Sequence, residues 1–267
     1  MSATRGMDER NAKFRRAIVR PPGTNFAAGL TTSKLGPPVH ELAIAQHQAY
    51  CDALRVCGLD VMVLPADDRY PDATFIEDVA VVTARGAIIT RPGAPSRMGE
   101  IESMREALAA LFPRSAAIAA PGTVDGGDVC QAGEQFFIGL SQRTNAPGVA
   151  QLGAWLESLG YSVRSVDLRR TDLLHLKSGM AALGEGRLAI VDALADDAAF
   201  RDFDRISVPA GEEHAANCVN VNGHILIPAG SRRFESALRE TCDSVIALEM
   251  SEFQKMDGGV SCLSLRF

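Results

Sequence analysis

The stretch that decides the fold is Cys218-Val219-Asn220-Val221-Asn222-Gly223-His224-Ile225-Leu226-Ile227. Apolar runs flank Asn222-Gly223, and Asn-Gly between such runs is the strongest short-range signal for a β-hairpin. Three further hairpins have the same pattern, each with glycine in its turn, and these turns lie at residues 84–86, 133–134 and 184–186. The sequence therefore predicts a hairpin as a repeated unit.

Each hairpin is followed by a helical pattern and then by a short apolar strand. The predicted helices cover residues 97–112, 146–159, 196–203 and 231–241, and the strands after them cover 116–119, 161–166, 206–208 and 245–248. The N-terminal part supplies a strand at 17–19, a helix at 39–56 and a strand at 61–64, and residues 260–267 are expected to pair beside 16–20 as the fifth hairpin. Units of hairpin, helix and strand at intervals of about 40 to 50 residues are typical of a radial or stacked repeat. An irregular α+β domain is the alternative.

Composition excludes several classes of function. The 267 residues carry a net charge of −6, with 46% hydrophobic and 22% charged residues, which is an ordinary globular composition. The sequence has no basic stripe of the kind that binds nucleic acid. It also has no apolar run long enough to cross a membrane. The six cysteines are scattered without CxxC spacing, which favours a reduced, cytoplasmic protein with free thiols. We expect residues 1–13 to be a disordered extension and residues 14–267 to form a single catalytic domain.

Unusual residues occur at one position of each repeat, just before the hairpin begins. If the repeats surround an axis, these positions converge on one pocket. The converging residues would be Glu77, Asp78, Asp125, His175 and Cys262. Taken singly, His175 would be a hydrogen-bonded strand histidine and Cys262 a buried thiol. Only their joint placement points to chemistry.

The combined set has a chemical logic. A cysteine attacks as a thiolate, and a neighbouring cation lowers its pKa. His175 can then serve as general acid and base, with Asp125 as the group that orients it. Glu77 and Asp78 remain as carboxylates, and carboxylates match a planar guanidinium through paired, charge-assisted hydrogen bonds.

Several motifs resemble those of the dimethylarginine dimethylaminohydrolases, over about residue 14 to the end. They lie at residues 24–38, 71–78 (Pro-Asp-Ala-Thr-Phe-Ile-Glu-Asp), 89–94, 121–128, 174–179 and 257–262 (Asp-Gly-Gly-Val-Ser-Cys). Asp-Gly-Gly-Asp alone is shared by the wider guanidine-modifying superfamily. The resemblance implies a pentein, which is a five-bladed, pseudo-symmetric α/β propeller of ββαβ modules around a central active site. The repeats indicate the same arrangement independently.

The resemblance also implies an activity. Nω-methylated arginines, namely asymmetric dimethylarginine and monomethylarginine, would be hydrolysed to citrulline and an alkylamine without metal or organic cofactor. Cys262 would form a covalent thiouronium intermediate, and His175 would protonate the departing amine and then activate water. Asp78, with Glu77, would hold the guanidinium. The other substrate contacts implied are Arg97 and Arg143 at the α-carboxylate, Asp72 and the Leu30 carbonyl near the α-amine, and the Met256 backbone. The Gly- and Pro-rich residues 21–38 suit a lid.

Two positions set this chain apart from its neighbours. Arginine deiminases of the superfamily carry His-x-Asp, whereas Lys177 here removes that acid and leaves room for alkyl groups. Some methylarginine hydrolases carry Glu at position 125, and the shorter Asp125 could contact His175 less directly. Other enzymes of the superfamily, acting on arginine or another alkylguanidine, and a non-catalytic methylarginine-binding protein are the alternatives. A metal on Cys262 and His175 would be inhibitory. A homodimer is possible.

Overall fold

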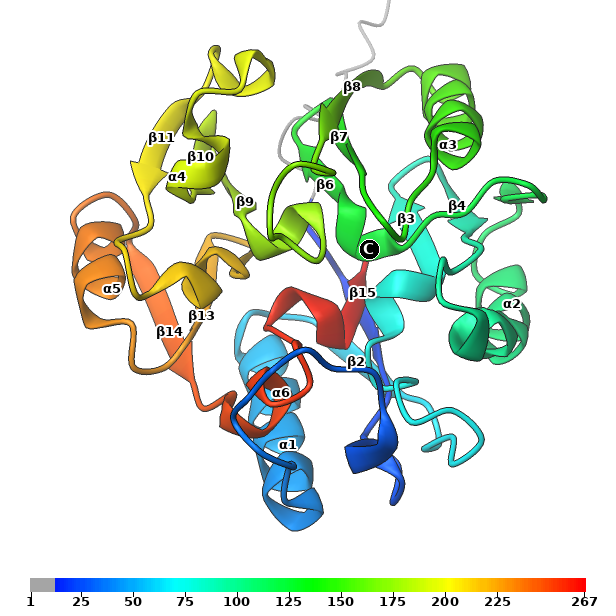
Figure 1. The fold of residues 1–267 in the computed structure, drawn as a ribbon, viewed down its shortest axis with the longest axis horizontal. Coiled ribbons are helices and arrows are strands. Elements are labelled where there is room, and N and C mark those ends of the chain that lie inside the picture. The colour runs from blue at the N-terminus through cyan, green and yellow to red at the C-terminus, as the bar shows by residue number, and fades with distance from the viewer. Residues whose placement is uncertain (1–12) are drawn as a thin grey trace, which may run out of the picture.

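The computed structural model describes residues 13–267, and these form five three-stranded sheets set around a centre (Figure 1). In each sheet two strands pair antiparallel, and a third pairs parallel with the middle strand. Except for the exposed Lys13, the extension expected at residues 1–13 lies outside the described residues. The arrangement confirms the five-bladed propeller.

One blade combines both ends of the described chain. It contains β15 (Ser264–Arg266), β1 (Arg16–Val19) and β2 (Asp60–Val63), with α1 (His40–Val56) between β1 and β2. The second holds β3 (Ala80–Thr83), β4 (Gly86–Ile89), α2 (Ile101–Ala109) and β5 (Ser115–Ala117), and the third β6 (Val129–Ala132), β7 (Gln135–Leu140), α3 (Ala146–Ser158) and β8 (Ser162–Asp167). The fourth holds β9 (Met180–Gly184), β10 (Arg187–Ile190), α4 (Asp192–Ala195) and β11 (Asp204–Ser207). The fifth holds β12 (Val219–Val221), β13 (His224–Pro228), α5 (Arg232–Arg239) and β14 (Ser244–Leu248), before α6 (Ser251–Gln254).

Local sequence explains the hairpins. Asn222 and Gly223 both have positive φ, at 56° and 95°, as a tight hairpin turn requires, and β12 pairs with β13 through Val219 opposite Leu226. The expected pairing of the chain ends is also present, with Ala17 opposite Arg266.

Three segments differ from expectation. The helix expected at 97–112 begins as a 3-10 turn, Pro95–Glu100, and continues as α2, Ile101–Ala109. Residues 260–267 are not one strand, because Ser261–Leu263 form a 3-10 turn (η9) and only Ser264–Arg266 pair with β1. The helix expected at 196–203 is instead α4 followed by a separate 3-10 turn, Ala198–Phe200. The Asp197 carboxylate accepts a hydrogen bond from the Ala199 amide, which starts this second turn and separates it from α4.

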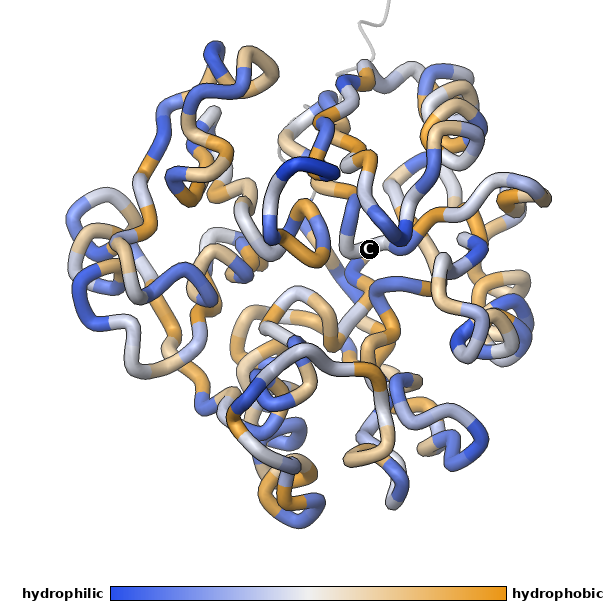
Figure 2. The backbone as a smooth tube through the Cα atoms, viewed as in Figure 1, coloured by the Kyte–Doolittle hydropathy of each residue, from blue (hydrophilic) through white to orange (hydrophobic). Residues whose placement is uncertain are grey.

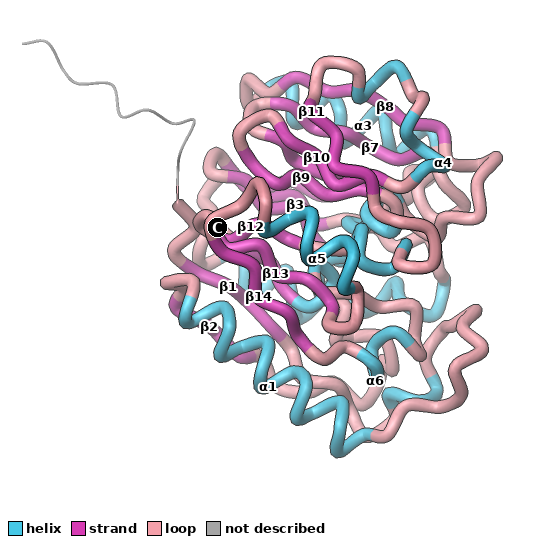
Figure 3. Tube along the Cα trace, turned by 90° about the vertical axis from the view of Figure 1, so that its left-hand side faces the viewer, coloured by secondary structure: helices cyan, strands magenta, loops and turns pink. Residues whose placement is uncertain are grey.

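The hydrophobic core is divided among the contacts between blades. Phe137, Leu188 and Ile225 come from three successive blades and share one cluster. Figure 2 shows apolar residues along the inner strands and hydrophilic residues on the outer sides of the helices. Figure 3, from the side, shows strands of neighbouring sheets running beside one another with α1 on the outside. Burying each large apolar side chain contributes about 1.5 to 3 kcal/mol. None of the helices within residues 13–267 has the length and apolarity to cross a membrane.

A short 3-10 turn precedes the inner strand of every blade. These turns are η3 (Ile76–Val79), η5 (Gly126–Asp128), η6 (Leu176–Ser178), η8 (Glu213–Ala216) and η9 (Ser261–Leu263). Consecutive turns contact one another from η9 through η3, η5 and η6 to η8, and we call this set the central ring. The ring explains why residues far apart in sequence meet at one place.

Candidate active site

A cavity of about 40 Å³ lies at the central ring, and we call it the front cavity. Its lining includes every site residue expected from the sequence except Glu77. These residues are Leu30, Asp72, Asp78, Arg97, Asp125, Arg143, His175, Met256 and Cys262. Phe75, Leu174, Asp257 and Gly258 complete the lining.

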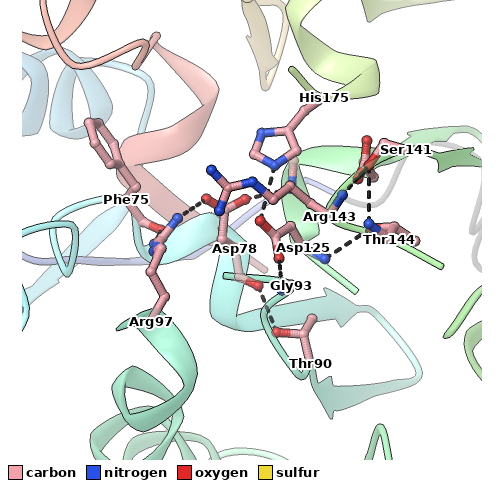
Figure 4. Close-up of polar contacts among 12 residues, drawn as sticks. Phe75, Asp78, Thr90, Gly93, Arg97, Asp125, Ser141, Arg143, Thr144 and His175 are labelled. Atoms are coloured by element: carbon pink, nitrogen blue, oxygen red, sulfur yellow. Dashed lines mark hydrogen bonds and ion pairs between the residues drawn. The ribbon is translucent and has the colours of Figure 1, made fainter. Parts of the chain in front are cut away.

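His175 and Asp125 form a direct pair. His175 Nε2 lies 3.1 Å from Asp125 Oδ2, and the Gly93 amide donates to Asp125 Oδ1 at 2.7 Å (Figure 4). The shorter aspartate side chain therefore reaches the imidazole without an intermediary. Burial opposes a charge on His175, but Asp78 and the hydrogen bond to Asp125 outweigh it and raise the pKa of His175 to about 9. The imidazole is thus protonated at neutral pH and can donate.

Cys262 lies in η9, half-buried at the front cavity. Burial, followed by the negative charges of Glu77 and Asp78, raises the pKa of the Cys262 thiol to about 11. The sulfur is therefore protonated in the ligand-free site. A cation placed between Cys262 and these carboxylates would act in the opposite direction.

Asp78 is an ionised acceptor at the floor of the front cavity. It accepts hydrogen bonds from Arg97 Nη1 at 2.6 Å and from the Gly127 amide at 2.8 Å. Burial disfavours its charge, yet Arg97 and then His175 lower the pKa of Asp78 to about 2. Each carboxylate oxygen has a second lone pair, so Asp78 can accept further hydrogen bonds.

Most hydrogen-bond donors of Arg97 are already engaged by the protein, although the side chain was expected to bind the α-carboxylate of a substrate. Its Nε and Nη2 groups donate to Glu100, and Nη2 also reaches the Phe75 carbonyl at 3.1 Å. With Nη1 on Asp78, at most one N–H of this guanidinium remains for a substrate. Arg143 differs, because its side chain points towards Asp78 in Figure 4 and has no hydrogen-bonded or ion-paired partner among the described residues.

Glu77, which was expected to hold the guanidinium together with Asp78, does not line the front cavity of the ligand-free protein. Its carboxylate contacts Lys177 Nζ at 2.6 Å, Arg266 Nη2 at 3.3 Å and Ser261 Oγ at 2.8 Å. These groups line a second cavity of about 150 Å³ on the other side of the central ring, which we call the rear cavity. Successive residues of η3 project to different sides of the central ring. Asp78 faces the front cavity, whereas Glu77 faces the rear cavity, where Lys177 and Arg266 neutralise its charge.

Residues 21–38 reach the front cavity at Leu30 and are held by several hydrogen bonds, which include those of Thr24 to Asp68 and of Thr31 to the Lys255 carbonyl. Two further contacts lie next to the cavity. The Leu30 amide donates to the buried Asp72 carboxylate at 3.1 and 3.2 Å. The Thr32 amide donates to Asp257 Oδ2 at 2.5 Å, and the Thr32 hydroxyl reaches the same oxygen at 3.0 Å. Asp257 adopts a left-handed φ of 57°, which turns its side chain towards this loop.

The repeated Asp-Gly-Gly motif is required by close packing. A Cβ on Gly259 would lie 2.4 Å from Asn217 Cγ, and one on Gly127 would lie 2.7 Å from His175 Nδ1. Neither glycine has a positive φ. The glycines therefore allow the backbone to approach the reactive side chains, rather than supplying an unusual turn.

Three groups of the front cavity have the spacing of a metal site. The ligand atoms of Asp78, Asp125 and His175 lie within 4.8 Å of one another. A metal needs neutral imidazole, whereas the surrounding carboxylates hold a proton on His175. Cys262, which an inhibitory metal would have to share with His175, is not part of this cluster. The three groups therefore favour a protonated His175 over a bound metal ion.

Sequence reasoning missed Asn217, which follows η8. Its Nδ2 lies 3.5 Å from Cys262 Sγ, and its Oδ1 accepts from the Ser261 amide at 2.8 Å. The only signal was its position, because it occupies the same place before a hairpin as the other reactive residues. Gly93, which holds Asp125 through its amide, gave no such signal.

Known proteins place this geometry in a family. The model described as N,N dimethylarginine dimethylhydrolase, eukaryotic, matches residues 34–208. The dimethylarginine dimethylaminohydrolase of Pseudomonas aeruginosa is 44% identical over 95% of this chain and 100% of that protein. The Streptomyces coelicolor protein of the same name is 38% identical over 94% of this chain and 96% of its own length.

Solved structures agree in fold. A cysteine-to-serine mutant of the Pseudomonas aeruginosa enzyme, complexed with citrulline, has a TM-score of 0.93 at 43% identity, covering 96% of this chain and 100% of that one. The N-terminal domain of a cyanobacterial arginine dihydrolase has a TM-score of 0.85 at 21% identity, covering 96% and 97%, and shares the fold. The chain belongs to the dimethylarginine dimethylaminohydrolase family and is a hydrolase of the dimethylargininase kind.

Proposed function

We propose that this chain hydrolyses asymmetric dimethylarginine and monomethylarginine to citrulline and an alkylamine through a covalent intermediate on Cys262. The observation that carries the proposal is the front cavity itself. A thiol, a protonated His175 paired with Asp125, and the anionic Asp78 face one small space. The family membership and the citrulline complex of the Pseudomonas aeruginosa relative support the same substrate class.

Substrate recognition would use both ends of the cavity. The guanidinium would lie against Asp78, whose remaining lone pairs suit a planar cation. Arg143 would bind the α-carboxylate, since most donors of Arg97 are already engaged by Glu100 and Asp78. Arg97 would thus contribute mainly positive charge and the placement of Asp78. Asp72, the Leu30 backbone and Met256 would enclose the amino-acid end.

The first half-reaction would begin with the substrate's own charge. A guanidinium beside Cys262 stabilises the thiolate, so the thiol proton is released to solvent. The sulfur then attacks the guanidinium carbon, and an S–C bond forms. The C–N bond to the methylated nitrogen breaks as His175 donates its proton, which releases a neutral alkylamine. A thiouronium remains on Cys262.

The second half-reaction would consume one water. The now neutral His175 takes a proton from water, and the hydroxide adds to the thiouronium carbon. The C–S bond breaks and its electron pair returns to sulfur, the hydroxyl proton of the added water is released to solvent, and citrulline departs. Asp125 keeps the imidazole oriented and stabilises its charged form in both steps.

Product analysis tests this proposal. The protein is incubated separately with asymmetric dimethylarginine and with arginine, beside a Cys262→Ser control. Citrulline and dimethylamine from the first substrate alone is the expected result. Citrulline and ammonia from arginine would instead assign a deiminase, and binding without product would assign a methylarginine-binding protein. The structure favours the first outcome, since Lys177 faces Glu77 and the rear cavity, leaving no acid at position 177.

A further inference from the structure

Asn217 closes the central ring beside the nucleophile. It follows η8, and its side chain reaches across to η9. The Ser261 amide donates to its Oδ1 at 2.8 Å, and its Nδ2 lies 3.5 Å from Cys262 Sγ. The Asn217 side chain is buried to about nine-tenths, and Gly259 has no Cβ where that side chain packs. One amide therefore contacts two consecutive residues of the reactive turn.

The orientation of this amide follows from its partners. A backbone N–H can only donate, so the atom facing Ser261 must be the oxygen. The amino group then faces Cys262 Sγ. Among the described residues, no other side chain donates a hydrogen bond to that sulfur.

The surroundings of Cys262 make a donor valuable. Burial, together with Glu77 and Asp78, holds the thiol pKa high, so a thiolate here lies close to two negative charges. An asparagine amide donates without a titration of its own and adds no charge to the site. A hydrogen bond to a charged acceptor is among the stronger kinds.

We propose that Asn217 is a catalytic residue whose Nδ2–H donates to the Cys262 thiolate, while its Oδ1 holds the turn that aims this sulfur. The assignment rests on the proposed function. The hydrogen bond weakens when sulfur charge enters the new S–C bond. It strengthens again when the C–S bond breaks and the electron pair returns to sulfur, so Asn217 stabilises the leaving thiolate as well as the nucleophile.

Asn217→Asp separates the two contacts. An ionised aspartate retains an oxygen for the Ser261 amide, lacks the donor to sulfur and adds a negative charge beside it, so a decreased rate must be matched by the uncharged Asn217→Ala, whereas an unchanged rate is decisive by itself. Asn217→Ala removes both. Asn220→Asp is the matched control, because Asn220 lies three residues further on, in β12, and donates to the Leu183 carbonyl rather than to the thiol. Thermal melting of each purified variant checks that it is folded.

The experiment measures alkylation of Cys262 by iodoacetamide between pH 8 and 10, read by mass spectrometry of the Cys262 peptide. Below the thiol pKa the rate reports the thiolate fraction, and loss of one charge-assisted hydrogen bond corresponds to a roughly 10- to 100-fold decrease. We expect this decrease for Asn217→Asp and Asn217→Ala, and a wild-type rate for Asn220→Asp.

Wild-type alkylation of Asn217→Asp, with only Asn217→Ala impaired, would reduce Asn217 to a positioning residue and overturn the donor role. If the aspartate variant does not fold, Asn217→Ala decides, because an unchanged rate in that variant also overturns it. Alkylation needs no methylarginine turnover. Failure of the proposed function would instead appear as an absence of citrulline from the wild-type protein, so the two failures are distinguishable.

Discussion

Glu77 and Asp78 are adjacent, equally buried and both acidic, yet they serve opposite sides of the central ring. Asp78 faces the front cavity. Glu77 faces the rear cavity, where it meets Lys177, Arg266 and the Ser261 hydroxyl. The rear group contains its own counter-charges.

The two carboxylates differ in what they contribute, because Glu77 stabilises the fold and Asp78 is available to a ligand. On the rear side, one carboxylate joins three blades, because Lys177 follows His175 by two residues and Ser261 precedes Cys262. On the front side, Asp78 retains lone pairs and Cys262 lacks a neighbouring cationic side chain that outweighs the carboxylates. A satisfied cluster stabilises the fold, whereas an incompletely satisfied one is available to a ligand.

The largest expected effect comes from comparing Cys262→Ser with Ser261→Ala, two adjacent residues on the two sides. The first variant should lose turnover of asymmetric dimethylarginine by roughly 10⁴-fold or more, because the nucleophile is removed. The second should keep activity within about tenfold but lose about 1 to 2 kcal/mol of unfolding free energy with its bond to Glu77. Citrulline assays and urea denaturation measure both. Retained turnover in Cys262→Ser would refute covalent catalysis.

The acidic neighbours give the next contrast. Asp78→Asn should lower kcat/KM about 100-fold, because a charged acceptor for the guanidinium is lost. Glu77→Gln should instead lower the unfolding free energy by about 2 to 4 kcal/mol, since the partly buried Lys177 and Arg266 lose their partner. Its KM should remain near the wild-type value. A large rise in KM for Glu77→Gln would return that residue to the substrate site.

The His175–Asp125 pair predicts a pH dependence of stability. Against the opposing effect of burial, Asp78, followed by the hydrogen bond to Asp125, raises the pKa of His175 from 6.5 to about 9 in the folded protein, so the charged imidazole stabilises the fold fully below pH 6.5. That contribution, roughly 3 kcal/mol, is lost as the pH rises through 9. Denaturation of wild type and His175→Gln at several pH values gives the difference directly. If the difference is constant from pH 6 to 10, the imidazole is not charged in the ligand-free site.

The smallest effect is expected at the loop over the front cavity. Thr32→Val removes the hydroxyl bond to Asp257 but keeps the backbone bond to the same carboxylate. Because the hydroxyl is exposed, its hydrogen bond contributes about 1 kcal/mol or less. We therefore expect KM to rise roughly two- to fivefold and the free energy of unfolding to stay unchanged. Steady-state kinetics and a thermal melt check this. A loss of stability would make the loop part of the scaffold.

Much of this arrangement could be predicted because its signals are local and repeated. Asn222-Gly223 specifies its hairpin through the turn residues alone. The recurrence of a unit of hairpin, helix and strand along the chain then implies a ring. Once the ring is accepted, His175, Asp125 and Cys262 must converge, and the structure brings them to one cavity.

The features that could not be predicted depend on which way individual side chains point in very short turns. In η3 two consecutive acidic side chains diverge, and neither strand nor helix periodicity indicates which of Glu77 and Asp78 faces the cavity. The contact of Asn217 with the thiol depends on η8 and η9 meeting in space, although 45 residues separate the two side chains. The break between α4 and the next turn depends on one side-chain cap at Asp197.

The pairing of β1 with β15 has a further consequence, for circular permutation. Four of the five described sheets join their antiparallel strands by a turn, whereas this sheet joins them only by hydrogen bonds. A chain opened between Glu185 and Gly186, with residue 267 linked back to Lys13, would keep every strand pair of the propeller. Cys262 would then precede His175 in the sequence. The order of the reactive residues would change, and their geometry would not.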